Sequence, residues 1–112
     1  IERGMAARTQ ALALMEFLRK RGVRVWIISA SAEPCVRAAM RHFGIEGELV
    51  GLRSVVHDGI YTSELIEPLS MFEGKAECIR QFIDPERPPL LAVGDSKSDL
   101  PMLEMADIRV AI

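Results

Sequence analysis

Apolar positions along the chain follow two patterns that alternate with each other. Between residues 7 and 21, apolar side chains recur at helical spacing, and the charged stretch LRKRG leads to Gly22 as a helix stop. Residues 23–28, VRVWII, are β-branched and almost continuously apolar, which is typical of a strand covered on both faces. Next, Ser31 can cap a second helix that Gly44 ends. The first part of the chain therefore predicts helix, strand and helix in that order.

The rest of the chain predicts a hairpin followed by further helices and strands. ELVGLRSVV and IYTSELIEPL flank HDG at residues 57–59, where Gly59 can take a positive φ, so residues 48–68 are expected to form a β-hairpin. The remaining elements are expected as a helix over 74–83, a strand over 90–93, a short helix over 99–106 and a last strand over 107–112. Strands that alternate with helices pair in parallel, which predicts an α/β fold, a three-layer sandwich with the hairpin as a small insertion.

Composition narrows the class of protein. The 112 residues, 49% apolar and 27% charged, suit one globular domain over residues 1–112. The net charge of −2 lacks the basic excess of nucleic-acid-binding proteins, and no apolar run approaches the ~20 residues of a membrane span. Cys35 and Cys78 form no metal-ligand or CxxC pattern, so we expect reduced, buried thiols. These features predict a cytoplasmic protein with a small-molecule ligand, and no nucleic-acid or membrane partner.

Polar side chains follow two of the predicted strands and begin one helix. Ser29 and Ser31 end one strand, Asp95 and Asp99 follow another in AVGDSKSD, and Lys75 begins a helix behind a glycine. Because ligands bind beyond the carboxyl ends of parallel strands, we expect these segments to meet at one rim. Carboxylates suit Mg²⁺, while hydroxyls, backbone N–H groups and a lysine suit phosphate oxygens. Each residue alone also has an ordinary explanation as a cap or a turn residue, so the prediction depends on the combination.

The order of these segments resembles the haloacid dehalogenase superfamily of phosphatases, nearest its phosphoserine-phosphatase-like branch. VWIIS, GKAE and GDSKSD look like the second, third and fourth motifs of that family, and the resemblance spans about residues 8–112. It implies a Rossmann-like core, with Mg²⁺ as cofactor and a small phosphate ester as substrate. The hairpin would then be a small second cap or an extension of the sheet, and we favour the extension.

The resemblance also implies a role for each site residue. Ser29 and Ala30 would bind the phosphoryl oxygens, and Lys75 would neutralise both the phosphate and the nucleophile, which makes Lys75 and Ser29 the catalytic candidates. Asp95 would bind Mg²⁺. Asp99 would support the waters of the metal or hold Lys75.

One motif of the family is missing from these residues. The first motif, DxDx[TV], carries the nucleophilic aspartate, and Asp58, Asp84 and Asp107 lie in a predicted turn, a loop and a strand entry. The helical cap is also missing, apart from a return helix over residues 7–21. Since the chain opens with Ile1, we expect a C-terminal core fragment whose N-terminal strand and cap belong to the same parent chain.

These inferences predict a parent protein that hydrolyses a small phosphomonoester with Mg²⁺, through an aspartyl-phosphate. The alternatives are a phosphotransferase or dehalogenase of the same superfamily, and a catalytically silent binding or regulatory domain. In the resembled fold the nucleophile strand lies between the strand that carries Ser29 and the strand before Asp95. Without it, unpaired backbone groups would cost ~1–3 kcal/mol each, unless VRVWII pairs directly with LLAVG. The fragment alone is therefore expected to be weakly stable and inactive.

Overall fold

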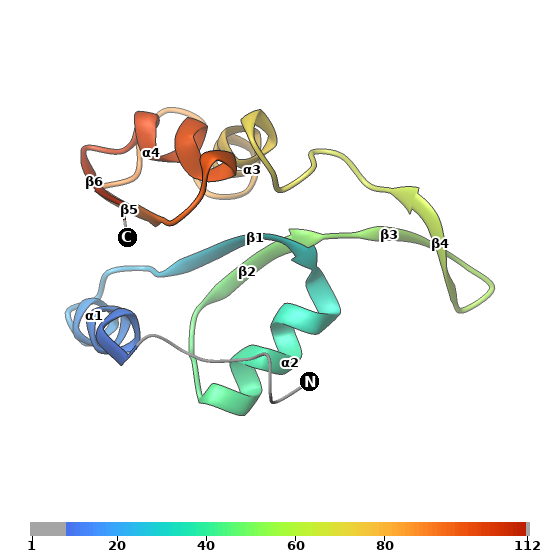
Figure 1. Ribbon diagram of the computed structural model, residues 1–112, viewed down its shortest axis with the longest axis horizontal. Helices are drawn as coiled ribbons and strands as arrows, with labels where there is room; N and C mark the ends of the chain where they lie inside the picture. Colours follow the sequence, from blue (N-terminus) through green and yellow to red (C-terminus); the bar gives the residue numbers. More distant parts are fainter. Residues whose placement is uncertain (1–8, 112) are drawn as a thin grey trace.

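The chain folds into short helices and strands, which a computed structural model describes for residues 9–111 (Figure 1). Their order is α1 (Thr9–Lys20), β1 (Trp26–Ala32), α2 (Glu33–Phe43), β2 (Glu48–Leu52), β3 (Ser54–His57), β4 (Ile60–Leu65), α3 (Glu73–Phe82), β5 (Leu91–Gly94), the 3₁₀ turn η2 (Lys97–Asp99), α4 (Leu100–Met105) and β6 (Ile108–Ala111). Residues 7 and 8 of the first predicted helix, and Ile112 of the last strand, lie outside the described part.

The described strands form three separate pairs. β1 pairs in parallel with β2, and β5 pairs in parallel with β6. β3 and β4 form an antiparallel hairpin. In Figure 1, α2 and β2 lie on one side of β1, while α3, α4, β5 and β6 lie on its other side. The parallel pairs and their helices confirm the predicted α/β class, and within residues 9–111 no ladder joins β1 to β5.

The first strand occupies a different range from the predicted one. β1 begins at Trp26 and continues to Ala32, because its later part still follows β2, with Ala32 opposite Leu52 across an irregular register. Ser31 therefore lies inside the strand, and its predicted role as a helix cap is wrong. The residue before α2 is Ala32, which makes no side-chain cap hydrogen bond, and Pro34 in the first turn supplies a backbone already suited to a helix start.

The end of α2 agrees with its prediction, whereas one cysteine does not. Gly44 takes a left-handed φ of 66°, as a helix-ending glycine should. Cys78 is a buried free thiol, but Cys35 is exposed, so the expectation of two buried thiols was wrong. The inward face of α2 carries Val36 and buried Met40, and helical spacing turns position 35 away from that face.

The hairpin is shorter than the predicted range of 48–68. Residues 48–52 form β2, an apolar strand with buried Val50 that pairs in parallel with β1, so only β3 and β4 form the hairpin. The turn matches its prediction: Asp58 and Gly59 have φ of 52° and 78°, both positive, as the twist of a two-residue hairpin turn requires. The hairpin projects from the body of the molecule (Figure 1).

The main hydrophobic core lies among α3, α4 and β5. Its buried members are Ile79, Ala92, Met102, Leu103 and Ala106. Ile28 of β1 packs against this cluster, so the core also links β1 to the β5 side of the molecule. This packing brings the N-terminus of α3 and the loop after β5 close to β1. Within the described residues, no helix is long and apolar enough to cross a membrane.

Candidate functional site

A buried ion pair joins the start of α3 to the loop after β5. Lys75 Nζ lies 2.7 Å from Asp99 Oδ1, and their side chains are only 6% and 9% exposed. The same ammonium donates a hydrogen bond of 2.9 Å to the carbonyl oxygen of Ile28 in β1. Lys75 therefore connects the β1–β2 pair with the β5–β6 pair, and the three segments singled out in the sequence meet around its charge.

The second carboxylate oxygen of Asp99 organises the loop that follows β5. Asp99 Oδ2 accepts the backbone N–H groups of Asp95 at 3.0 Å and Ser96 at 3.3 Å, and also the Ser96 hydroxyl at 3.3 Å. Gly94 makes this fold of the loop possible, because a Cβ there would lie 2.6 Å from the Cβ of Asp99. Both oxygens of Asp99 are thus engaged, one by Lys75 and one by its own loop.

The charge of Asp99 is set by two opposing effects. Burial acts to raise the pKa of its carboxyl, but the hydrogen bond from Lys75 and those from the backbone N–H groups of Asp95 and Ser96 act to lower it. The net pKa of Asp99 is lowered, so the carboxylate is charged at neutral pH. A charged carboxylate at 2.7 Å holds the Lys75 ammonium in place.

Ser29 and Ala30 lie within β1 beside this ion pair. The Ser29 side chain is half-buried, and its hydroxyl accepts the backbone N–H of Ser31 at 3.1 Å. Ala30 is exposed. Both residues follow directly on Ile28, whose carbonyl holds Lys75. The structure thus places Ser29 and Ala30 next in the chain to the residue whose carbonyl holds Lys75.

Sequence reasoning missed Ser70. This side chain has no exposed surface, and its hydroxyl donates a hydrogen bond to the carbonyl oxygen of Ser29. The bond fastens the loop between β4 and α3 to β1. A serine in a loop carries no periodic or motif signal, so only the folded chain reveals this contact.

Asp95 is the carboxylate with which this site could contact a metal. It directly follows β5 and is exposed, whereas Asp99 is buried. Among residues 9–111, no group of three or more His, Cys, Asp or Glu side chains is arranged to hold a metal ion. Mg²⁺ commonly uses one or two protein carboxylates and completes its shell with water and phosphate oxygens. The described residues fit that ion through Asp95, with Asp99 in a supporting position.

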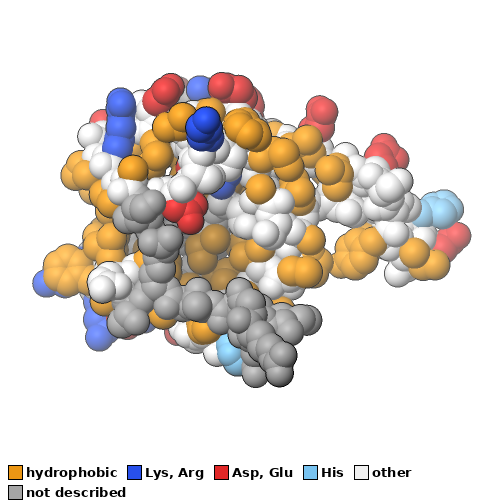
Figure 2. All heavy atoms as spheres, in the orientation of Figure 1, with side chains coloured by type: hydrophobic (Ala, Val, Ile, Leu, Met, Phe, Trp, Pro, Cys, Tyr) orange, Lys and Arg blue, Asp and Glu red, His pale blue; other side chains and the backbone are white. Residues whose placement is uncertain are grey.

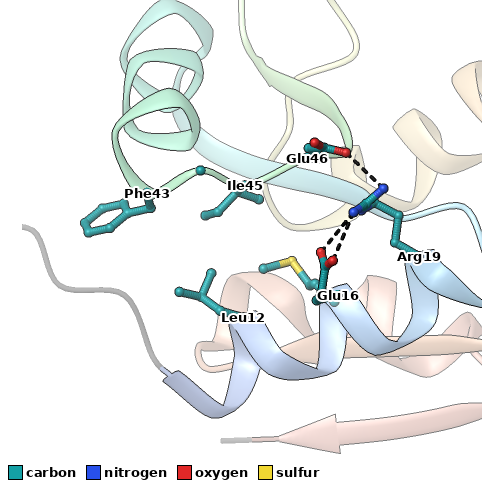
Figure 3. A pocket seen from close by; sticks show the side chains of 8 residues that line it. Leu12, Glu16, Arg19, Phe43, Ile45 and Glu46 are labelled. Carbon is teal, nitrogen blue, oxygen red and sulfur yellow. Dashed lines mark hydrogen bonds and ion pairs between the residues drawn. The ribbon is translucent and has the colours of Figure 1, made fainter.

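A hollow of about 190 Å³ lies away from these residues, between α1 and the connection from α2 to β2. Its apolar lining includes Leu12, Met15, Phe43 and Ile45. Arg19 makes ion pairs there with Glu16 at 3.0 Å and Glu46 at 2.9 Å (Figure 3). Because two carboxylates already neutralise its one cation, this hollow is a poor place for a phosphate, and its ion pairs tie α1 to the loop before β2.

Comparison with known proteins finds relatives that are phosphoserine phosphatases. A phosphoserine phosphatase of Halobacterium salinarum is 32% identical over 114 residues, covering 97% of this chain and 53% of that protein. The phosphoserine phosphatase SerB1 of Mycobacterium tuberculosis is 33% identical over 94 residues, covering 81% of this chain and 30% of that protein. The chain thus spans about a third of one of these relatives and about half of the other.

Structure and family comparisons cover most of the chain. The crystal structure of a Bordetella pertussis protein of unknown function shares the fold with a TM-score of 0.73, at 23% identity, over 87% of this chain and 46% of that one. A sequence profile of haloacid dehalogenase-like hydrolases matches residues 2–104, and this range contains the whole Lys75–Asp99 arrangement. With that match, the chain belongs to the haloacid dehalogenase-like hydrolase family.

Proposed function

We propose that the protein is a Mg²⁺-dependent hydrolase of a small phosphomonoester and that this chain supplies its phosphate-binding and metal-binding residues. The observation that carries the proposal is the buried Lys75 ammonium, held by Asp99 at 2.7 Å and by the Ile28 carbonyl at 2.9 Å. A cation fixed by two partners, one of them the residue directly before Ser29, is already oriented before a phosphate arrives. Hydrolase and phosphoserine phosphatase relatives support the same reaction class.

The proposed reaction proceeds through an aspartyl-phosphate. An aspartate oxygen attacks phosphorus while the bond to the alcohol oxygen breaks, and a general acid gives the leaving oxygen its proton. Water then gives a proton back to that group as it attacks the acyl phosphate, which releases inorganic phosphate and restores the aspartate. Lys75 stabilises negative charge on the phosphoryl oxygens, and Ser29 and Ala30 orient them. When bound through Asp95, Mg²⁺ would neutralise further charge on the same group. Asp99 is a positioning residue because it acts through Lys75 and the loop.

The described aspartates offer no substitute for the nucleophile. Asp58 is in the hairpin turn, Asp107 precedes β6, and Asp84 accepts the backbone N–H groups of Glu86 and Arg87 at 2.9 and 3.1 Å. Each lies apart from the carboxyl ends of β1 and β5. We therefore assign the nucleophile to residues outside this chain.

We further propose that the nucleophile strand inserts between β1 and β5. Each of these strands has a ladder partner on one edge only among the described residues. A parallel strand between them would complete one sheet and bring its carboxyl end to Lys75. In this proposal residues 1–112 are a partial catalytic core, the first helix returns from a cap, and the chain by itself is inactive. The protein is predicted to be cytoplasmic.

A catalytically silent binding domain is the second candidate. Its support is the lack, among residues 9–111, of a group of three or more His, Cys, Asp or Glu side chains that could hold a metal ion. Such a domain would bind phosphate through Lys75 and Ser29 but turn nothing over. A phosphotransferase or dehalogenase would keep the nucleophile but change the acceptor or the leaving group.

The test compares Lys75→Met with Lys97→Met in the full-length protein, because Lys97 is exposed in η2 and serves as the matched control. With Mg²⁺ and a panel of small phosphomonoesters, Lys75→Met should lower kcat by about 100-fold, a typical loss for one group that stabilises transition-state charge. Lys97→Met should leave kcat unchanged. Wild-type protein that binds phosphate without any turnover would instead support the silent binding domain.

A further inference from the structure

An open hollow of about 370 Å³ lies beside the start of α3 and belongs to the loop that follows β4. We call it the loop hollow. Its lining includes Pro68, Leu69, Met71, Phe72 and the two glutamates Glu67 and Glu73. In Figure 2, hydrophobic side chains form a band across the upper part of the molecule, over α3 and the loop that leads into it. The hollow is therefore an apolar surface with an acidic rim.

The loop hollow is fastened to the residues that would bind phosphate. Ser70, within the same loop, donates its hydroxyl to the carbonyl oxygen of Ser29. At the other end, the backbone N–H of Lys75 donates to the carbonyl oxygen of Phe72 at 3.0 Å. The loop closes tightly on itself, because a Cβ at Gly74 would lie 1.7 Å from the carbonyl oxygen of Leu69. The wall of the loop hollow is thus held in place by hydrogen bonds and close packing, and it adjoins the candidate site.

Phe72 has an unfavourable backbone for its residue type. Its φ is 49° and its ψ is −128°, a combination that a side chain with a Cβ rarely adopts. Phe72 as a whole residue is 55% exposed, so burial does little to offset the strain. Strained residues of this kind concentrate at ligand-binding and catalytic sites, where a fixed orientation of the side chain is useful. Phe72 therefore presents an exposed aromatic side chain, on a strained backbone, beside the start of α3.

We propose that the loop hollow receives the organic part of the phosphomonoester and that Phe72 is a specificity-determining residue. This inference rests on the proposed phosphatase function, because a phosphate held by Lys75 and Ser29 would direct its ester substituent along the adjoining wall. The lining contains two glutamates and no lysine or arginine. Like charges repel, so the hollow favours neutral or cationic substituents over those with a carboxylate or a second phosphate.

The experiment measures Phe72→Ala and Phe72→Gly in the full-length protein with Mg²⁺. With phenyl phosphate both variants should raise KM by about tenfold, the scale of lost contact with a few apolar carbons, while inhibition by inorganic phosphate stays the same. Phe72→Gly removes the ring and also relieves the backbone strain, so it should keep or raise Tm. Phe17→Ala is the matched control, since that ring in α1 is 51% exposed. Equal changes for phenyl phosphate and phosphate, or no change, would overturn the assignment.

Binding measurements separate this inference from the proposed function. Measured by calorimetry, Phe72→Ala should weaken the binding of phenylphosphonate, which is not hydrolysed. The binding of inorganic phosphate should be unaffected. If Phe72→Ala shows this selective loss but the wild type shows no turnover, the hydrolase proposal fails and the loop hollow stands. If turnover is normal and both ligands bind Phe72→Ala as tightly as wild type, the hydrolase stands and the loop hollow fails. Wild-type protein that binds neither ligand would reject both proposals.

The acidic rim has its own test in the Glu67→Gln, Glu73→Gln double variant. Removing both charges should raise kcat/KM for 3-phosphoglycerate relative to phosphoethanolamine, because repulsion of the carboxylate is lost. The kcat/KM for phenyl phosphate, whose substituent is neutral, should be the same in the double variant and in the wild type. An unchanged ratio of 3-phosphoglycerate to phosphoethanolamine would refute the charge selectivity.

Discussion

The Lys75 ammonium and the Asp99 carboxylate form an ion pair of 2.7 Å although α3 and η2 are separate elements of the chain. Both side chains are nearly buried, so each charge depends on the other for compensation. Because the pair also holds Ile28 of β1 and the backbone after β5, a change in either charge should be felt across the whole candidate site. This pair is the basis of the first prediction.

Stability should fall in acid because of Asp99. Its folded-state pKa lies below the ordinary value of 3.8, so its contribution to stability is fully present above that value and is lost as pH falls through the folded pKa. Urea unfolding of the full-length protein should therefore show a decline below about pH 4. Asp99→Asn should be less stable at neutral pH and should lose part of this decline. Identical acid profiles for the variant and the wild type would contradict the assignment.

Asp95→Asn should weaken Mg²⁺ binding and activity in the full-length protein. A neutral amide is a poorer ligand for a hard cation than a carboxylate. The hydrogen bond from residue 95 to Asp99 uses the backbone N–H, so it survives the change. Calorimetric titration with Mg²⁺ measures the change in Mg²⁺ binding. Asp107→Asn, an exposed aspartate before β6, is the control, and full activity of Asp95→Asn would reject Asp95 as a metal ligand.

Ser70→Ala should destabilise the protein and loosen the loop hollow. The change removes the buried hydroxyl that donates to the Ser29 carbonyl, and losing such a hydrogen bond costs about 1 kcal/mol. Chemical unfolding measures this loss, and KM for phenyl phosphate should rise with it. The exposed Ser63 of β4 provides the control, Ser63→Ala, which should change neither quantity. Equal stability of the two variants would show that the Ser70 hydroxyl contributes nothing to the loop.

The 112 residues expressed alone should be weakly stable, prone to aggregate and inactive as a phosphatase. Among the described residues β1 and β5 have no ladder to each other, and an open strand edge is a template for association with other chains. Urea unfolding, size-exclusion chromatography and turnover with Mg²⁺ are the measurements. A monomer that unfolds cooperatively and hydrolyses a phosphomonoester would contradict both the open edge and the assignment of the nucleophile to other residues.

Local features of this chain could be read from the sequence because their causes are local. Gly44 ends α2 and Gly59 completes the hairpin turn, and both need a positive φ that glycine adopts easily. The α/β class followed from alternating helix and strand patterns. The same alternation led us to expect the segments of Lys75 and Asp99 at one rim, and the two side chains do meet there.

Tertiary structure alone decided which strands pair and which side chains meet. Residues 48–52 look like one arm of a hairpin but pair in parallel with β1, since an apolar strand is most stable where both faces are covered. Ser31 looks like a cap but continues β1, because the ladder to β2 extends past it. Ser70 and Phe72 carry no sequence signal, because a buried hydroxyl finds its acceptor, and a strained backbone finds its support, only through residues that folding brings near.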